Sequence, residues 1–467
     1  MYREGDMDLD KQSILDRLEA RRKLSDACDY PNVRSRRVRL KKLLSLIVEH
    51  REAAVSALQE DLGKSEFESL STELLPLAGI LRYLIRKLPG LARRHRVGVS
   101  WMNFPASGYV VPEPYGMVLV VATWNYPLLL ALEPLVGAYA AGNQVVLKLT
   151  DRVPNVKRFL QWLIQEAFDG EITLIDSELS FEELLKERFD YIFYTGNENG
   201  GHEVLRAAAE HLTPATLELG GKSPCIVAPG ANIKVAARRI VWGKFTNCGQ
   251  TCVAPDYLIV HADLKARLME ALRETVSDFY GEETLESPDL GHLVDSRAYE
   301  RASRLISNGR LVCGGDKKPE RLSIEPTVID RLAADDPLLN EEIFGPVLPV
   351  LSYEKESELF SEIRKHGKPL AMYCFGGDRA LRERLRSGCS SGALVFDDVV
   401  THFINPDMPF GGVGSSGMGA YHGKRTFDTF CHYKPVMAQS RWFDLPFRYP
   451  PFSQLRTALL RWLLRWQ

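Results

Sequence analysis

The sequence lacks three features that would assign it to a specialised class of protein. Its 467 residues have a formal net charge of only −2, so the whole chain has no bulk attraction to nucleic acid or to an anionic membrane. No apolar run reaches the roughly 18 residues that a transmembrane helix needs. The eight cysteines are spread thinly and show no paired framework. Nucleic acid is therefore not an expected partner, and neither a membrane-spanning nor a disulfide-held protein is expected.

The remaining composition is that of an ordinary globular protein. Hydrophobic residues make up 45% and charged residues 26% of the chain. The length exceeds what one ordinary core holds and predicts two or three domains. The chain begins with Met-Tyr-Arg-Glu-Gly-Asp, which is polar where a secretory signal has an apolar segment. With unpaired cysteines, this start favours a reducing, cytoplasmic setting.

Apolar runs typical of buried parallel strands alternate with helical patterns. Long helical stripes occupy 38–62 and 66–84, and residues 94–112 break the periodicity with β-branched residues and two prolines, which predicts an extended arm or hairpin. The expected strands lie near 116–124, 144–149, 190–194, 223–228, 257–261, 347–353, 370–375 and 392–396, and further helices near 128–141, 156–168, 232–245 and 264–280. The fold class is therefore α/β, in two units with right-handed crossovers.

The most informative stretch is Asn-Cys-Gly-Gln-Thr-Cys, residues 247–252. A thiol is a weak nucleophile until it loses its proton, so a working cysteine needs a local field, often a helix N-terminus, and a partner group. Gly249 permits a tight backbone before Cys252. Glu218 lies 34 positions upstream, directly before Leu-Gly-Gly. Together they suggest a nucleophile and a general base.

Two other interpretations apply to these cysteines. Taken alone, a cysteine such as Cys252 is more often a buried structural thiol, and Cys248 is interpreted as one. A metal site is disfavoured because three residues separate the pair and no second Cys or His pair with zinc-ligand spacing lies nearby. No metal is therefore expected.

Five motifs, in order along the chain, resemble those of the aldehyde dehydrogenase superfamily. They are Thr-Trp-Asn-Tyr-Pro (123–127), Glu-Leu-Gly-Gly-Lys-Ser-Pro (218–224), Asn-Cys-Gly-Gln-Thr-Cys-Val-Ala-Pro-Asp (247–256), Glu-Glu-Ile-Phe-Gly-Pro (341–346) and Pro-Phe-Gly-Gly-Val-Gly (409–414). The Tyr-Thr-Gly-Asn run and Gly-Met-Gly-Ala-Tyr-His-Gly-Lys (417–424) most resemble its class 3, or fatty aldehyde, branch. The resemblance extends from about residue 15 to about residue 437.

The resemblance implies a Rossmann-type cofactor domain, an α/β catalytic domain and a small bridging arm. The implied boundaries are 1–93 and 113–217 for the NAD(P)-binding domain, 218–408 for the catalytic domain, 94–112 and 409–437 for bridging and oligomerisation elements, and 438–467 for a C-terminal tail. In the family, the arm pairs with a late strand, here 429–437, and helps to form a homodimer.

The resemblance also implies NAD or NADP as cofactor. A parallel sheet binds nucleotides at the carboxyl ends of its strands. The loop at 195–201 is rich in glycine but is not Gly-x-Gly-x-x-Gly, and in the family pattern Gly196 and Gly201 allow close approach to the pyrophosphate. The implied cofactor contacts are Trp124, Lys148, Asp151, Thr195, Gly196, Asn197, Gly201, Leu219, Glu342 and Phe344.

Within this set, the resemblance places Lys148 at the adenine-side ribose, Glu342 at the nicotinamide-side ribose and Phe344 against the nicotinamide ring. The family usually has Lys-Pro-Ser-Glu where this chain has Lys-Leu-Thr-Asp, ending at Asp151. The shorter acid leaves more room for a 2′-phosphate, so the choice between NAD and NADP stays open. Residues 176–181 replace a glycine-containing loop of the family, and the contact expected there is unassigned.

The implied reaction oxidises an aldehyde to a carboxylic acid. The Cys252 thiolate attacks the carbonyl, and the oxyanion of the thiohemiacetal accepts hydrogen bonds from the Asn125 amide and the Cys252 backbone N–H. Hydride transfer leaves a thioester, and Glu218 activates water to hydrolyse it. Partial burial is expected to raise the pKa of Glu218.

Two alternatives remain open. Family members that pass the acyl group to coenzyme A commonly lack a glutamate at position 218, and a non-catalytic binding or structural protein on the same fold would be expected to have lost Cys252, Glu218 or Asn125. All three are present. Tyr126, Trp242 and Thr251 match positions of the family's substrate tunnel, which favours medium- or long-chain aliphatic or aromatic aldehydes, although ordinary core packing explains them equally well.

The C-terminal tail has the composition of a helix that lies in a membrane interface. One helical face carries Leu455, Leu459, Trp462, Leu463 and Trp466, with Arg461 and Arg465 beside it. The segment is too short to span a bilayer. Residues 455–467 are therefore expected to contact a membrane surface peripherally, with docking on the same domain or on a dimer partner as the alternative.

Overall fold

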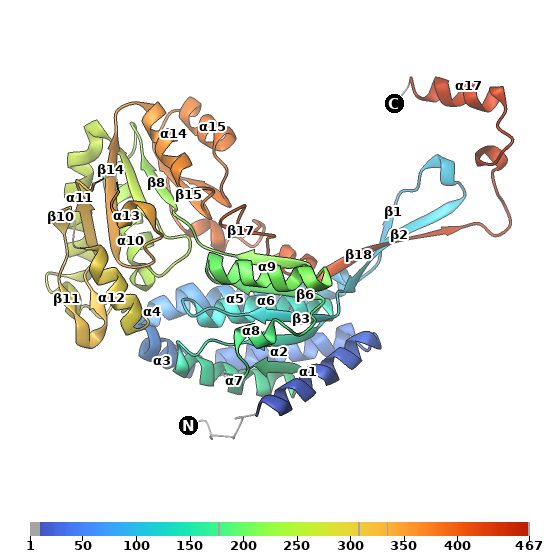
Figure 1. Ribbon diagram of the computed structural model, residues 1–467, viewed down its shortest axis with the longest axis horizontal. Helices are drawn as coiled ribbons and strands as arrows, with labels where there is room; N and C mark the ends of the chain where they lie inside the picture. The colour runs from blue at the N-terminus through green and yellow to red at the C-terminus, as the bar shows by residue number, and fades with distance from the viewer. Residues whose placement is uncertain (1–9, 176–177, 307–308, 334, 466–467) are drawn as a thin grey trace.

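In the computed structural model, which describes residues 10–175, 178–306, 309–333 and 335–465, the chain forms two α/β lobes and a projecting arm (Figure 1). The first lobe contains a six-stranded sheet in the order β17-β7-β6-β3-β4-β5. Its strands are β3 (Met117–Val121), β4 (Gln144–Lys148), β5 (Ile172–Ile175), β6 (Tyr191–Thr195), β7 (Ala215–Glu218) and β17 (Gly417–Met418). All are parallel except β17, which pairs antiparallel with β7. The strands predicted near 116–124, 144–149 and 190–194 are confirmed, whereas the four-residue strands β5 and β7 were not predicted.

Helices bury both faces of this sheet. They are α1 (Lys11–Asp26), α2 (Val33–Glu49), α3 (Arg51–Leu62), α4 (Glu66–Ser69), the π-helical turn η1 (Leu70–Leu74), α5 (Leu75–Leu91), α6 (Pro127–Ala141), α7 (Pro154–Phe168), α8 (Phe181–Leu184) and α9 (Glu198–His211). Alternate residues of β3 face opposite sides: Val118 and Val120 share a core with α6, and Leu119 and Val121 share another with α1 and α9. Every residue of α6 is buried, which agrees with its continuous apolar run.

The single long helix predicted over 38–62 is wrong. The structure has α2 and α3, separated at His50, whose backbone is non-helical (φ −104°, ψ 26°). The His50 ring packs edge to face on Trp162 of α7, with 4.6 Å between centroids. The apolar stripe continues through the break, with Leu40 and Leu58 both fully buried, and the periodicity therefore hid the bend.

The second lobe contains a seven-stranded sheet in the order β10-β13-β14-β9-β8-β15-β16. Its strands are β8 (Pro224–Val227), β9 (Tyr257–His261), β10 (Arg310–Cys313), β13 (Thr327–Asp330), β14 (Val347–Tyr353), β15 (Ala371–Phe375) and β16 (Ala393–Phe396), and only β10 runs antiparallel to its neighbour. Its helices are α10 (Ile233–Phe245), α11 (Ala262–Tyr280), α12 (Ser296–Leu305), α13 (Pro337–Asn340), α14 (Glu356–Lys365) and α15 (Arg379–Gly388). The five strands and two helices predicted after Glu218 are confirmed.

Smaller elements connect these parts. They are η2 (Trp101–Asn103), η3 (Thr246–Gly249), η4 (Thr284–Glu286), β11 (Lys317–Lys318), η5 (Pro319–Arg321), β12 (Ser323–Ile324), η6 (Thr401–Ile404), α16 (Lys424–Asp428) and η7 (Pro446–Arg448).

The arm is an antiparallel three-stranded sheet that projects away from both lobes (Figure 1). It contains β1 (His95–Val97), β2 (Ala106–Pro114) and β18 (Cys431–Gln439). The predicted pairing of the arm with a late strand is confirmed, in a register from Cys431 opposite Pro114 to Gln439 opposite Ala106. The preceding segment, 409–430, behaves differently: it places β17 and α16 against the first lobe, where the Asn143 amide donates to the Phe430 carbonyl at 3.0 Å.

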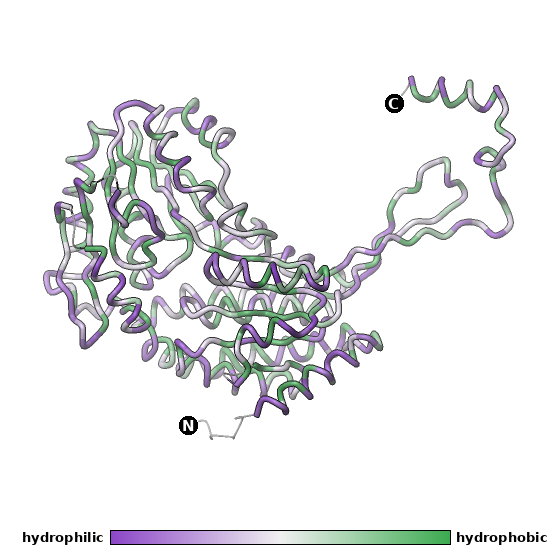
Figure 2. The backbone as a smooth tube through the Cα atoms, in the orientation of Figure 1, coloured by the Kyte–Doolittle hydropathy of each residue, from purple (hydrophilic) through white to green (hydrophobic). Residues whose placement is uncertain are grey.

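The tail forms α17 (Gln454–Leu463), which lies beyond the arm and has no buried residue. The predicted helix is thus confirmed, and hydrophobic and hydrophilic residues alternate along it (Figure 2). Trp466 of the predicted apolar face lies outside the described residues. Among the described helices, none is both long and apolar enough to cross a membrane.

Candidate active site

A cavity of about 1130 Å³ lies between the two lobes, at the carboxyl ends of β3, β4, β6 and β7. Fifteen of the sixteen residues singled out in the sequence line it: Trp124, Asn125, Tyr126, Lys148, Asp151, Thr195, Gly196, Asn197, Glu218, Leu219, Trp242, Thr251, Cys252, Glu342 and Phe344. Gly201 does not line it. This glycine is buried in α9, where a Cβ would lie 3.1 Å from Leu219, so its small size serves helix packing.

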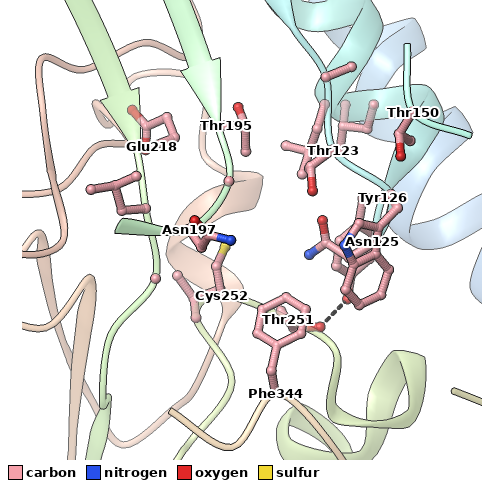
Figure 3. Close-up of a pocket in the computed structure, with 18 of the residues that line it drawn as sticks. Thr123, Asn125, Tyr126, Thr150, Thr195, Asn197, Glu218, Thr251, Cys252 and Phe344 are labelled. Atoms are coloured by element: carbon pink, nitrogen blue, oxygen red, sulfur yellow. Dashed lines mark hydrogen bonds between the residues drawn. The ribbon is translucent and has the colours of Figure 1, made fainter. Parts of the chain in front are cut away.

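Cys252 lies in the turn between η3 and β9 and lines the cavity together with Asn125 and Glu218 (Figure 3). Gly249 has a φ of +74°, and a Cβ there would lie 2.3 Å from the Gly345 carbonyl oxygen, so the tight backbone expected before the cysteine is confirmed. No helix begins at Cys252, so the local field is not supplied by a helix N-terminus. The chain instead closes a turn, with the Ala254 N–H donating to the Thr251 carbonyl at 2.9 Å, and enters β9.

Buried hydrogen bonds join the Asn125 loop to the cysteine loop. The Gln250 carbonyl accepts from the side-chain amides of Asn125 at 3.0 Å and Asn247 at 3.1 Å. The Asn247 amide also donates to the Asn125 carbonyl at 2.7 Å. One N–H of the Asn125 amide is therefore used within the protein, and its second N–H is left for a ligand in the cavity.

A fully buried ion pair supports the Asn125 loop. Lys64 Nζ lies 2.6 Å from Glu73 Oε1 and donates to the Asn125 carbonyl at 3.1 Å. The other Glu73 oxygen accepts from the backbone N–H groups of Leu128 and Leu129, at the N-terminus of α6. The carboxylate thus caps the helix, and the ammonium holds the loop that precedes it.

Glu218 is the last residue of β7 and is only 3% exposed. Neither of its carboxyl oxygens has a hydrogen-bond partner. Burial, and secondly the charge of Glu133, raises the pKa of Glu218 well above its ordinary value, as expected from the sequence. Such a carboxylate can accept a proton near neutral pH.

Burial and nearby negative charges also act on the Cys252 thiol. Burial raises the pKa of its thiol to about 12, and the nearby carboxylates of Glu342 and Glu218 add to the effect. The free protein therefore holds Cys252 as a thiol, and the thiolate-stabilising field expected from the sequence is absent from it.

Glu342 and Phe344 lie on a loop that several contacts hold against the cavity. A Cβ at Gly220 would lie 2.2 Å from Glu342 Oε1, so any side chain at position 220 would displace this carboxylate. Burial raises the pKa of Glu342 to about 7. Arg301 donates to the Ile343 carbonyl at 2.6 Å and to the Glu342 carbonyl, and the Phe344 ring packs edge to face on Trp124 at 5.4 Å.

The cofactor half of the cavity has polar groups suited to an anionic dinucleotide. The N-terminal turn of α9 lines it, capped by Asn197, which accepts from the Gly200 N–H at 2.9 Å. The Thr195 hydroxyl is buried without a partner. A Cβ at Gly196 or Gly200 would lie within 2.3 Å of the Tyr194 hydroxyl, so these positions must remain bare backbone. These residues fit NAD or NADP.

The residues expected at the adenine side of the cofactor also carry charge. Lys148, at the end of β4, donates to the Leu179 carbonyl at 3.2 Å, and Asp151 pairs with Lys157 at 2.5 Å. Lys157 is a basic group that no sequence motif singled out.

Some residues that line the cavity were also missed. Arg152 lies over the Trp124 ring at 4.2 Å and pairs with Asp295 at 2.6 Å. No local motif marks Arg152, because its partners are brought to it only by the fold. Phe410 and Tyr421 also line the cavity and could have been found, since both lie in runs that carry the family resemblance.

The part of the cavity around the expected substrate residues, Tyr126, Trp242 and Thr251, is mainly apolar. The Tyr126 hydroxyl hydrogen-bonds to Thr251 Oγ1 at 2.5 Å (Figure 3), which satisfies both polar groups within the wall. Trp242 is 39% exposed, so it is a wall residue and not core packing. The apolar lining around them includes Leu129, Leu130, Phe403 and Ile404.

Comparison with known proteins gives a consistent result. Residues 10–436 match the model of the Aldehyde dehydrogenase family. The chain is 42% identical to the 4,4′-diaponeurosporen-aldehyde dehydrogenase of Staphylococcus aureus, over 90% of this chain and 92% of that protein. It is 39% identical to aldehyde dehydrogenase family 3 member A2 of Mus musculus, over 92% of this chain and 90% of that protein.

Solved structures agree. The chain superposes on the substrate-bound state of Staphylococcus aureus AldH with a TM-score of 0.93 at 38% identity, over 96% of this chain and 99% of that one. More distant structures of the same fold, at 22% and 24% identity, are complexes with NADP+ and NAD+.

The high pKa of Cys252 has a measurable consequence in the free protein. Thiolate is the reactive form, so alkylation by iodoacetamide should be slow at pH 7 and rise about tenfold per pH unit up to pH 10. In urea-unfolded protein, the alkylation rate of the same cysteine should level off above the ordinary thiol pKa of about 8.5. Peptide mapping by mass spectrometry measures both rates. If the alkylation rate of the folded protein reached a plateau below pH 9, the raised pKa of Cys252 would be contradicted.

Proposed function

The chain belongs to the aldehyde dehydrogenase family and oxidises aldehydes with NAD or NADP, and on that premise we propose that it converts medium- or long-chain apolar aldehydes to carboxylic acids through Cys252 and Glu218. One observation carries the proposal: Cys252, Glu218 and Asn125 line the same cavity, whose substrate half is apolar. The nucleophile, the base and a hydrogen-bond donor thus surround the place where the carbonyl would lie.

We assign the polar half of the cavity to the coenzyme. Lys148 and Asp151 would contact the adenine-side ribose, Thr195 and the first turn of α9 the pyrophosphate, and Glu342 the other ribose. Trp124 and Phe344 would lie beside the nicotinamide, with Leu219 in the same wall. NAD or NADP, when bound, supplies the hydride acceptor. Because Asp151 is short and pairs with Lys157, we propose that a 2′-phosphate is tolerated.

Glu218 serves first as the base for the thiol. Its raised pKa brings it closer to that of Cys252, which makes proton transfer from Sγ less unfavourable. The sulfur then bonds to the carbonyl carbon. The oxyanion that forms accepts hydrogen bonds from the free N–H of the Asn125 amide and from the Cys252 backbone N–H.

Glu218 serves a second time in hydrolysis. Oxidation of the thiohemiacetal leaves a thioester on Cys252, and a water molecule attacks its carbonyl carbon while Glu218 takes a proton from that water. The carbon–sulfur bond breaks and the carboxylic acid leaves. Transfer of the acyl group to coenzyme A is the alternative outcome, and the buried carboxylate beside the cavity favours water.

The apolar wall supports a long hydrophobic substrate. Leu129, Leu130, Trp242, Phe403 and Ile404 contribute apolar surface, and burial of each additional CH₂ is worth about 0.8 kcal/mol. A relative at 42% identity is named for 4,4′-diaponeurosporen-aldehyde, a name that points to the same class of substrate.

The arm supports a homodimer. It projects from both lobes and exposes apolar side chains that a single chain leaves in solvent, among them Trp101, Met102, Phe104 and Met437. We propose that a second copy covers this surface. A monomer in light scattering at micromolar concentration would contradict the proposal.

The tail supports contact with a membrane surface. Leu455 is 84% exposed, and Leu459 and Trp462 are also exposed, beside Arg461. Apolar side chains and arginines on one short helix suit an anionic lipid interface. We therefore propose a cytoplasmic enzyme held peripherally at the membrane, where long-chain aldehydes partition.

The nucleophile and base can be separated by kinetics. Cys252→Ala should abolish formation of reduced nicotinamide from a medium-chain aldehyde. Glu218→Gln should lower steady-state turnover by about 100-fold while leaving a slow burst of up to one reduced nicotinamide per chain. Stopped-flow absorbance with and without coenzyme A measures both.

Cys248→Ala is the matched control, because this buried cysteine lies outside the cavity wall and its loss should leave turnover in place. Turnover that requires coenzyme A would favour the acyl-transfer alternative, and an active Cys252→Ala would refute the proposed nucleophile.

Membrane contact predicts co-sedimentation with vesicles that contain phosphatidylglycerol. The double variant Leu455→Glu with Leu459→Glu should weaken binding by about tenfold or more, because it places two charges on the apolar face. Leu212→Glu, at a 90% exposed leucine of the first lobe, should bind like wild type. Equal binding of all three proteins, or none, would argue against the tail as a membrane contact.

A further inference from the structure

A second group of buried polar side chains lies beside Glu218 in the first lobe. Pairing of β17 with β7 sets Gly417 opposite Glu218, and Tyr421, which precedes His422, lines the same cavity as Glu218. The segment that follows β17 carries His422 and Thr426, which meet Glu133 of α6. Glu133 and Thr426 are fully buried and His422 is 3% exposed. The group has no part in the chemistry proposed for Cys252 and Glu218.

Hydrogen bonds define how His422 is protonated. Its Nδ1 lies 3.0 Å from Glu133 Oε1. The same oxygen accepts from the Thr426 hydroxyl at 3.0 Å, and that hydroxyl accepts from the His422 backbone N–H at 2.9 Å. Because a carboxylate oxygen only accepts, Nδ1 carries the hydrogen and Nε2 presents a lone pair.

Polar atoms without partners are concentrated here. Among the described residues, the buried atoms that lack a hydrogen-bond partner include His422 Nε2, Glu133 Oε2, both oxygens of Glu218 and both ring nitrogens of His402. Such atoms are rare in folded proteins, and a cluster of them marks a functional or strained site. The charge of Glu133 also adds to the raised pKa of Glu218, which shows that the two carboxylates are close in space.

The proposed reaction requires an outlet for a proton at this place. Glu218 takes one proton from the Cys252 thiol and another from water, so it must lose the first before the second step. During that interval the acyl group lies on Cys252, in the same cavity as Glu218.

Aromatic rings pack against His422 and against the adjacent Tyr421. Phe403 lies against the His422 ring at 5.2 Å between centroids, and Phe410 packs on Tyr421 at 5.8 Å. These contacts leave the His422 ring buried beside the cavity that Glu218 lines.

We propose that His422, held in place by Glu133, accepts the proton from Glu218 between formation of the thiohemiacetal and hydrolysis of the thioester. The O–H bond of the Glu218 carboxylic acid breaks, and an N–H bond forms at His422 Nε2, directly or through one water molecule. The resulting imidazolium is stabilised by the Glu133 carboxylate at Nδ1. The inference rests on the proposed function, and Glu133 is a positioning residue in it.

The other titratable groups around His422 do not offer the same acceptor. They are Glu133 on α6, Glu218 on β7, His402 on η6 and the adjacent Tyr421. Burial, and secondly the charge of His422, lowers the pKa of His402 to about 4, so that histidine stays neutral. Burial raises the pKa of Tyr421 well above its ordinary value, so its hydroxyl keeps its proton.

The test separates acylation of Cys252 from loss of the acyl group. With 4-nitrophenyl octanoate, which needs no coenzyme, the burst of 4-nitrophenolate reports acylation and intact-protein mass spectrometry follows decay of the acyl-enzyme. His422→Gln can still donate to Glu133 but cannot take a proton. It should keep the burst and slow the decay by roughly 10- to 100-fold.

The pH profile distinguishes a proton acceptor from a structural residue. The pH profiles of decay in wild type and in His422→Gln should differ in shape, because only the wild-type side chain at position 422 can accept a proton. Glu133→Gln should slow decay to a smaller extent, because the imidazolium loses its counter-charge. His402→Phe, which keeps the ring packed on Phe410, should decay within twofold of wild type.

Each contrary result has a distinct meaning. Wild-type decay in His422→Gln would overturn the inference alone. If the burst and the decay rate of the acyl-enzyme fell by the same factor in His422→Gln and the pH profile did not change, His422 would have a structural role. That result would also overturn the inference. No acyl-enzyme in wild type would overturn both this inference and the proposed use of Cys252.

Discussion

The Lys64–Glu73 ion pair is the interaction on which the arrangement of the site depends. Both groups are fully buried, and together they hold the Asn125 carbonyl and the first N–H groups of α6. A buried pair adds little net stability compared with apolar residues, but loss of one partner leaves an uncompensated charge, at a cost of about 3 to 5 kcal/mol. Its effect is therefore to select one position of the Asn125 loop, and through Gln250 one position of the cysteine loop.

The second lobe repeats this arrangement with different residues. Lys222 follows the Glu218 turn, pairs with Asp256 at 2.5 Å and donates to the carbonyls of Leu338 and Glu341. The other Asp256 oxygen accepts from the Ile343 N–H at 2.9 Å. The turn after the base and the loop of Glu342 are thus tied to one buried pair. Each lobe holds its half of the cavity rigidly, as pre-organised catalysis requires.

The electrostatics of the free protein favour the thiol form of Cys252 and make Glu218 a stronger base. Burial raises the pKa of Glu218, Glu342 and Cys252, and the two carboxylates also act on the thiol. Such a site does not hold a ready thiolate, so proton movement becomes central to its chemistry. This is the physical reason why a buried histidine–carboxylate pair beside Glu218 acquires a role.

Local sequence determined much of this protein. Apolar runs identified the central strands, because strands covered on both faces need continuous hydrophobic side chains. The motifs alone marked Cys252, Glu218 and Asn125 as site candidates, and the fold brings all three to one cavity. Tertiary structure alone decided the rest. The bend at His50 and the pairing of Glu133 with His422, 289 positions apart, depend on contacts between distant segments. Local periodicity reports which face of an element is buried, but it does not report which distant side chain that face will meet.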